Sequence, residues 1–151
     1  MALALREATR AASLGEVPVG AVVVQHGVVL GRGGNMVETR GDATAHAEMI
    51  ALREAVDALG DWRLVDAAMY VTLEPCPMCA GALILARVGT VVFGARDPKF
   101  GACGSVVDLL GGGPRWNHRV AVVAGVEEDE SARLLREFFA RRRAGPPDAE
   151  P

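Results

Sequence analysis

The chain has 151 residues, of which half are apolar and 23% are charged, and its net charge is −3. This length suits one compact domain, and the composition excludes a disordered protein. The apolar runs are far shorter than the ~20 residues of a membrane span and the first residues lack a signal peptide's order, so we expect a cytoplasmic location without membrane association.

The hydrophobic pattern predicts helices and strands that alternate along the chain. The predicted helices span residues 3–14, 44–59, 77–87 and 127–143, and the predicted strands span residues 17–25, 28–33, 67–73, 90–95 and 119–125. The turn signal His26-Gly27 makes the first two strands an antiparallel hairpin. Thr44 is expected to cap the second helix, and Gly60 is expected to end it.

This order of elements predicts an α/β fold, a three-layer α/β/α sandwich with a central mixed sheet of five strands. Residues 1–143 are expected to form a single domain, and residues 144–151 a disordered tail. The segment 96–118 is rich in Gly and Pro. It predicts a loop or short irregular helix of the kind that often borders an active site.

Three cysteines, with two in Cys-x-x-Cys spacing, fit a reducing compartment in which thiols bind metals or carry out redox chemistry. Cys76 and Cys79 stand where a strand meets a helix, and helix N-terminal amides favour thiolates there. His46 opens another predicted helix. One imidazole and two thiolates are three zinc ligands, and a catalytic zinc site keeps its fourth position for water. We therefore predict one Zn²⁺ per subunit, with Cys103 as a packing residue instead of a fourth ligand.

Glu48 lies two residues after His46, and in the first turn of a helix both side chains can reach the same pocket. Zinc lowers the pKa of bound water, so a zinc-bound hydroxide is expected as the nucleophile. Glu48 can then carry protons from that water to a ring nitrogen and to the departing amine. The combination of His-x-Glu with Pro-Cys-x-x-Cys predicts a hydrolytic deaminase that acts on a nucleobase.

The residues themselves leave other functions open. Cys-x-x-Cys alone is typical of a structural half-site or a redox pair, which would make the protein a non-catalytic zinc module. The same zinc and Glu48 chemistry would also serve a deaminase of free guanine, cytosine or a nucleotide.

Longer motifs extend over nearly the whole chain and resemble the bacterial tRNA-specific adenosine deaminases, within the cytidine/deoxycytidylate deaminase superfamily. His-x-Glu and Pro-Cys-x-x-Cys mark only that superfamily, whereas two longer runs point to this branch. These runs are Val71-Thr72-Leu73-Glu74-Pro75-Cys76 and Phe93-Gly94-Ala95-Arg96-Asp97.

The resemblance implies a cytidine deaminase-like fold and a homodimer that converts adenosine to inosine at the wobble position of a tRNA anticodon stem-loop, acting on an extruded base. It also implies that Asn35 hydrogen-bonds the base and that Val17 and Pro18 form part of the pocket. Asp97 and Lys99 would lie near the RNA backbone and the flanking nucleotides.

Two positions depart from the family pattern, and one charged segment has an open role. Phe100 stands where a small residue is expected, and Cys103 replaces an expected Ala. Phe100 either stacks on a flanking base or packs inward. The net charge of −3 gives no support to a nucleic-acid partner, but five arginines lie between Arg133 and Arg143. These arginines either hold phosphates, remain solvated or make dimer contacts.

Overall fold

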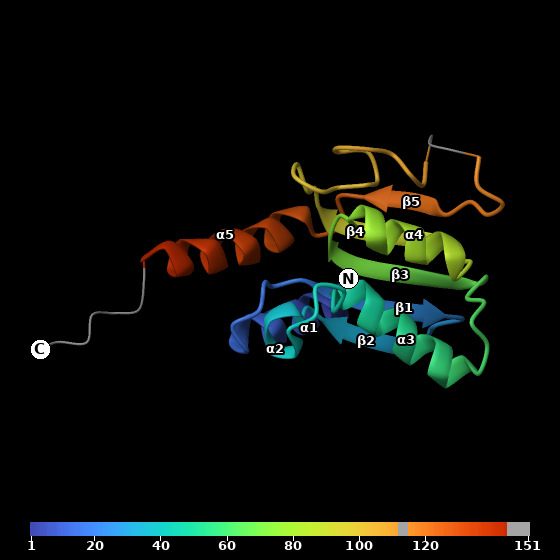
Figure 1. Ribbon diagram of the computed structural model, residues 1–151, viewed down its shortest axis with the longest axis horizontal. Coiled ribbons are helices and arrows are strands. Elements are labelled where there is room, and N and C mark those ends of the chain that lie inside the picture. The colour runs from blue at the N-terminus through green and yellow to red at the C-terminus, as the bar shows by residue number, and fades with distance from the viewer. Residues whose placement is uncertain (112–114, 145–151) are drawn as a thin grey trace, which may run out of the picture.

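The computed structural model describes residues 1–111 and 115–144. Five strands form one sheet in the order β2-β1-β3-β4-β5 (Figure 1). The strands are β1 (Gly20–Gln25), β2 (Val28–Gly34), β3 (Ala67–Leu73), β4 (Thr90–Ala95) and β5 (Ala121–Ala124). β1 pairs antiparallel with β2 and β3, whereas β4 pairs parallel with β3 and β5. The predicted mixed sheet of five strands is confirmed.

Helices cover both faces of this sheet. They are α1 (Ala2–Ser13), α2 (Val37–Arg40), α3 (Ala47–Leu59), α4 (Pro77–Leu85) and α5 (Glu128–Ala144). α3 and α4 contact each other in front of the sheet, while α1 lies behind it and contacts α5 (Figure 1). This arrangement is the predicted three-layer sandwich. Among the described residues, no helix is both long enough and apolar enough to cross a bilayer.

Two glycines of β2 set the position of α3, and with it the position of the residues at its N-terminus. A Cβ atom at Gly31 or Gly33 would clash with the α3 backbone at Ala51 and Ala47 respectively. The residues of α3 that face the sheet are themselves small and fully buried, among them Ala55. Because neither partner carries a bulky side chain here, helix and strand pack unusually closely.

The N-terminal cap of α3 differs from the prediction. His46 is the N-cap residue, and Thr44 instead donates its hydroxyl to Asp42 Oδ1 at 2.7 Å. The predicted cap at Thr44 is therefore wrong, because the Asp42 carboxylate accepts from both the amide and the hydroxyl of Thr44 in a turn that ends before the helix. Gly60 ends α3 in the left-handed region with φ 71°, as expected.

Several boundaries also shift. β1 begins at Gly20 instead of residue 17, because Pro18 has no amide proton and the amide of Val19 bonds back to the carbonyl of Val17. α2 is not among the predicted elements. The described part of segment 96–118 contains turns and one bridge but no helix, which confirms the loop. Ala144 still belongs to α5, and the rest of the predicted disordered tail lies outside the described residues.

Candidate active site

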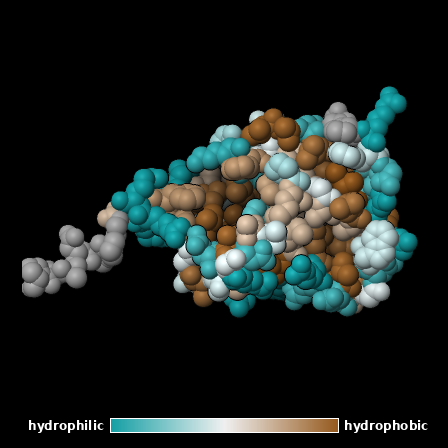
Figure 2. Space-filling view, viewed as in Figure 1, coloured by the Kyte–Doolittle hydropathy of each residue, from teal (hydrophilic) through white to brown (hydrophobic). Residues whose placement is uncertain are grey.

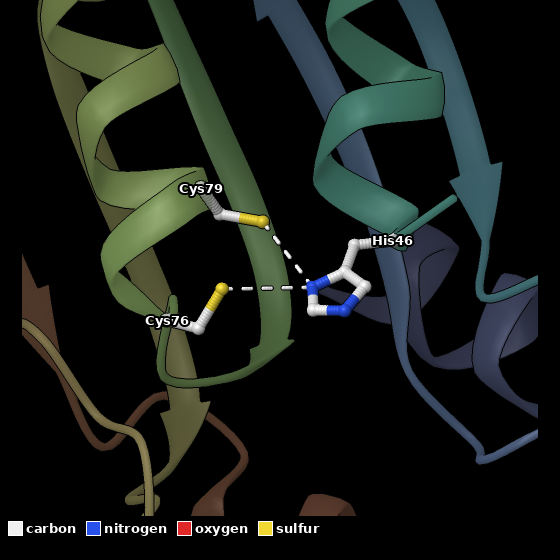
Figure 3. A group of neighbouring side chains, drawn as sticks. All are labelled: His46, Cys76 and Cys79. Atoms are coloured by element: carbon white, nitrogen blue, oxygen red, sulfur yellow. Dashed lines mark hydrogen bonds between the residues drawn. The ribbon is translucent and has the colours of Figure 1, made fainter. Parts of the chain in front are cut away.

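His46, Cys76 and Cys79 converge at the carboxyl end of β3, as predicted from the two helix starts (Figure 3). His46 is the N-cap of α3, Cys76 is the N-cap of α4, and Cys79 lies in the first turn of α4. The Nδ1 atom of His46 is 3.6 Å from the Sγ atom of Cys76 and 3.5 Å from that of Cys79. Among the described residues, this is the one group of three such side chains that could hold a metal ion.

The spacing of these three atoms fits a zinc ion. Zinc bonds of about 2.3 Å to sulfur and about 2.0–2.1 Å to nitrogen, at a tetrahedral angle, separate the nitrogen from each sulfur by about 3.6 Å. The two distances from His46 Nδ1 match that value. Two sulfurs and one imidazole nitrogen are also a donor set that zinc prefers.

The electrostatics of the two thiols favour a bound cation. A hydrogen bond from Cys79 lowers the pKa of Cys76 to about 4, and hydrogen bonding with Cys76 together with burial raises the pKa of Cys79. The hydrogen bond with Cys76 also raises the pKa of His46. A metal ion bound to both sulfurs would displace any thiol proton and leave two thiolates.

Glu48 lies in the first turn of α3 and is only 4% exposed. Burial raises its pKa to about 7, partly offset by its own backbone amide and by His46. A carboxyl group that titrates near neutrality can both accept and return a proton at physiological pH. Glu48 is outside the group of three side chains that could hold a metal ion, so that group does not require its carboxylate.

A cavity of about 710 Å³ contains His46, Cys76 and Glu48 in its wall. Its size lies within the range typical of small-molecule and cofactor sites. Val19, which precedes β1, and Leu73, at the end of β3, belong to the same wall. The cavity therefore joins the candidate metal centre to an apolar space that could receive a flat ring.

The other predicted site residues divide into two groups. Val17, Asn35 and Asp97 line this cavity, whereas Pro18 and Lys99 are not among its lining residues. Contacts of these five residues with a substrate stay predictions.

Two buried carboxylates that sequence reasoning missed hold the rims of the cavity. Glu16 accepts hydrogen bonds from Asn35 Nδ2 at 3.1 Å and from the amides of Glu38 and Thr39, at 3.3 and 2.6 Å. Burial alone would raise its pKa, but these hydrogen bonds outweigh burial and lower it. Glu16 is thus held as an anion beneath one rim.

Glu74 plays the corresponding part at the other rim. It accepts hydrogen bonds from the amides of Asp97, Cys103 and Ser105, and from the hydroxyl of Ser105. Burial acts to raise its pKa, but these bonds lower it. A charged residue directly after the strand that ends at Leu73, and directly before Pro-Cys, was the signal available in the sequence. The segment 97–105 therefore wraps around one buried carboxylate.

The structure excludes one of the two alternatives for Phe100. Phe100 lines the cavity but is 66% exposed, so inward packing is wrong. Cys103 is buried, and burial raises its pKa to about 12. It lies outside the metal-binding group and packs with the core, as expected.

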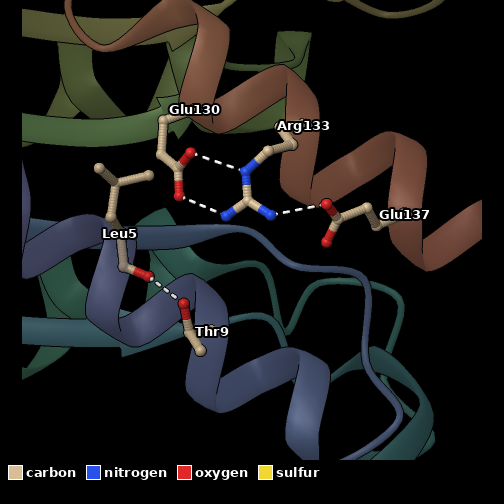
Figure 4. Close-up of polar contacts among 5 residues, drawn as sticks. All are labelled: Leu5, Thr9, Glu130, Arg133 and Glu137. Atoms are coloured by element: carbon tan, nitrogen blue, oxygen red, sulfur yellow. Dashed lines mark hydrogen bonds and ion pairs between the residues drawn. The ribbon is translucent and has the colours of Figure 1, made fainter.

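The C-terminal arginines are not equivalent. Arg133 donates to Glu130 through two nitrogens, at 2.6 and 2.8 Å, and to Glu137 at 2.6 Å (Figure 4). The guanidinium of Arg142 lies 5.5 Å from the ring centroid of Phe138. The C-terminal part of α5 projects from the body of the molecule (Figure 1), and its last residues, 141–144, are exposed.

Comparison with known proteins places this geometry among deaminases. Residues 1–143 match the MafB19-like deaminase family. The tRNA-specific adenosine deaminase of Bacillus subtilis (strain 168) is 51% identical over 140 residues, which cover 93% of this chain and 86% of that protein. A solved structure from a study of A-to-I editing by tRNA:A34 deaminases at the wobble position has a TM-score of 0.82 and 46% identity, with 89% of this chain and 97% of that chain covered. A guanine deaminase from Nitrosomonas europaea has a TM-score of 0.76 and 25% identity, with 92% and 82% covered.

Proposed function

The chain belongs to the MafB19-like deaminase family and within it to the tRNA-specific adenosine deaminases, and we propose that it converts the wobble adenosine of a tRNA anticodon loop to inosine by hydrolysis. One observation carries this proposal. His46 and Cys76, two of the three side chains that could hold a metal ion, line the same cavity as a buried carboxyl, Glu48, that lies outside this group.

We propose that these three side chains hold one zinc ion, with each thiol deprotonated. When bound, zinc lowers the pKa of a coordinated water molecule and so supplies a nucleophile near neutral pH. Glu48 accepts a proton from the attacking water and transfers it to a ring nitrogen, which makes the ring carbon electrophilic. Glu48 then takes the remaining proton of the added hydroxyl and gives it to the amino group, which leaves as ammonia. Water and adenosine thus become inosine and ammonia.

The base that reacts must leave the anticodon loop and enter the cavity. Val17 and Val19 offer apolar contact to its ring, and Pro18 lies between them in the chain. Asn35 provides a carboxamide that both accepts and donates hydrogen bonds. Asp97 lies at the cavity and Lys99 just outside it, so we assign Asp97 to a flanking nucleotide and Lys99 to the phosphate backbone.

We further propose that the protein works as a homodimer in the cytoplasm. Apolar side chains gather on the face that carries α3 and α4 (Figure 2), and Leu85 at the end of α4 is 73% exposed. A second copy is one way to cover such a surface. A tRNA substrate and metal-binding thiols both suit a reducing compartment.

The test compares an anticodon stem-loop with free bases. We expect inosine at the wobble position, measured by mass mapping, and ammonia release that matches it, with about one zinc per chain by elemental analysis. The alternative is a free-base deaminase, favoured by the likeness to the guanine deaminase. Ammonia from free guanine or cytosine, with none from the stem-loop, would replace the proposed function by that alternative. A chain that binds zinc but releases no ammonia from any of these substrates would be a non-catalytic module.

A further inference from the structure

Glu16 determines which way the side-chain amide of Asn35 faces. Its carboxylate is fully buried and lies 3.1 Å from the Nδ2 atom of Asn35. An ionised carboxylate only accepts hydrogen bonds, so it must face the NH₂ group of Asn35 and not the carbonyl oxygen. The usual ambiguity between the two ends of an Asn amide is therefore removed by chemistry.

The carbonyl oxygen of Asn35 is left available. Within the described residues, Oδ1 of Asn35 has no hydrogen-bond partner. It is nevertheless not a fully buried atom without a partner, because the described side-chain atom of that kind is Ser131 Oγ. Oδ1 therefore keeps some accessible surface, although Asn35 as a whole is only 8% exposed. Asn35 lines the cavity that contains His46 and Glu48, so an acceptor on this side chain is placed to serve a substrate there.

We propose that Glu16 is a positioning residue that fixes the Asn35 amide with its oxygen free to accept a hydrogen bond from an N–H or O–H group of the substrate nucleoside. This inference rests on the proposed function, in which Asn35 contacts the extruded nucleoside. Glu16 itself is buried and is not among the residues that line the cavity. Its effect on the substrate therefore passes through Asn35.

Glu16 has a second, structural role that the test must separate. Its carboxylate also accepts from the amides of Glu38 and Thr39 in the first turn of α2. The N-cap residue of α2, Met36, supplies no side-chain hydrogen bond, so these helix-end amides are satisfied by Glu16, a residue far from them in the sequence. Any substitution of Glu16 disturbs α2 as well as Asn35.

Glu16→Gln replaces one carboxylate oxygen, which accepts hydrogen bonds, by an NH₂ group, which donates them. If the new oxygen keeps the short bond to the Thr39 amide, the new NH₂ group faces two donors, Asn35 Nδ2 and the amide of Glu38. A flip of the Asn35 amide relieves the clash with Asn35 but turns its NH₂ group toward the cavity. We expect KM for the stem-loop to rise about 10-fold or more, with kcat within about twofold of wild type.

The swapped pair Glu16→Gln/Asn35→Asp restores the missing acceptor. The NH₂ group of the new glutamine donates to one oxygen of the new aspartate, and the other oxygen again faces the cavity. Asn35→Asp alone places a second buried carboxylate against that of Glu16. Their repulsion should raise KM at least as much as Glu16→Gln does. We expect the swapped pair to bring KM back to within about threefold of wild type.

The swap separates the two roles, because the amides at α2 see the same glutamine in Glu16→Gln and in the swapped pair. Thermal stability should stay lowered in both variants, while KM recovers only in the pair. A pair whose KM is as high as that of Glu16→Gln would overturn the proposal and leave Glu16 as an anchor for α2.

A matched control and a readout without turnover complete the test. Glu54 accepts the amide of Arg32 at 2.6 Å outside this cavity, so Glu54→Gln should leave KM unchanged. The side-chain amide NMR signals of Asn35 should move in Glu16→Gln but not in Glu54→Gln, and unmoved signals would contradict the amide flip. The yield of inosine from the stem-loop with the wild-type protein tests the proposed function separately. If only a free base is deaminated, KM of the wild type, Glu16→Gln and the swapped pair is compared with that base as the substrate.

Discussion

Glu74 accepts a hydrogen bond from the backbone amide of Asp97 at 3.0 Å, and this contact ties the strand that leads to Cys76 to the loop that borders the cavity. The other oxygen of Glu74 accepts hydrogen bonds from the backbone amides of Cys103 and Ser105. The rim that contains Asp97 and Phe100 is therefore fixed by the residue two positions before Cys76.

Glu74→Gln should lower the free energy of unfolding by about 1–3 kcal/mol, because one end of the new amide places a donor against backbone donors. The pKa of Glu74 lies below its ordinary value of 4.5, so its carboxylate stabilises the fold above pH 4.5 and loses this effect as pH falls through the lower folded pKa. The stability difference between wild type and Glu74→Gln, measured by urea unfolding, should therefore shrink on acidification. A difference that is constant with pH would show that the charge of Glu74 is unimportant.

Glu48→Ala should leave the zinc content unchanged and reduce deamination by at least about 100-fold, since the main proton carrier is removed while the three metal-binding side chains remain. Elemental analysis and single-turnover inosine formation measure the two effects. Cys103→Ala is the matched control for a buried residue outside the metal group and should retain both zinc and activity. Retained activity in Glu48→Ala would exclude Glu48 from the reaction.

The pH profile of kcat/KM should rise from acidic pH and level off above about pH 7. Burial raises the pKa of Glu48 to about 7, and only the ionised form can accept the proton of the attacking water. The acidic limb should thus lie well above the ordinary glutamate pKa of 4.5. A limb centred near 4.5 would show that the folded protein does not perturb this carboxyl.

Phe100→Ala should weaken stem-loop binding by about 5-fold or more without changing stability, because a base that stacks on an aromatic ring contributes about 1–3 kcal/mol. Phe100 lies at the cavity with most of its surface exposed, and its amide is held by Asp97 Oδ1 at 3.3 Å. Fluorescence anisotropy with a labelled stem-loop measures the affinity. Trp62→Ala removes an exposed aromatic residue outside the cavity and should have no effect. Equal decreases in affinity for both variants would remove the stacking role.

The grouping of His46, Cys76 and Cys79 could be predicted from the sequence because these residues stand at the starts of two helices, and helix starts have strong local signals. The contacts that hold the rims of the cavity could not be predicted in this way. Glu16 and Asn35 are 19 residues apart, and Glu74 and Cys103 are 29 residues apart, so their contacts exist only after the sheet has formed. α2 has four residues, which is too short for hydrophobic periodicity to reveal.

One local signal was available in the sequence and would have changed the prediction for the arginines. Glu130 and Glu137 stand three residues before and four residues after Arg133, the spacings at which helix side chains meet. The structure forms both ion pairs. Arg133 is therefore already matched by two carboxylates, whereas the consecutive arginines 141–143 lie at the exposed end of α5.

This difference predicts how salt should affect RNA binding. If residues 141–143 bind phosphates, replacing all three by Gln should reduce the slope of log affinity against log salt by about 0.7–0.9 for each phosphate that is no longer neutralised. Arg133→Gln should change the slope little, because the guanidinium is engaged by Glu130 and Glu137. Anisotropy titrations from about 50 to about 200 mM salt give the slopes. If the triple variant keeps the wild-type slope, the end of α5 lies outside the RNA interface, and its charges serve solvation or association between copies of the chain instead.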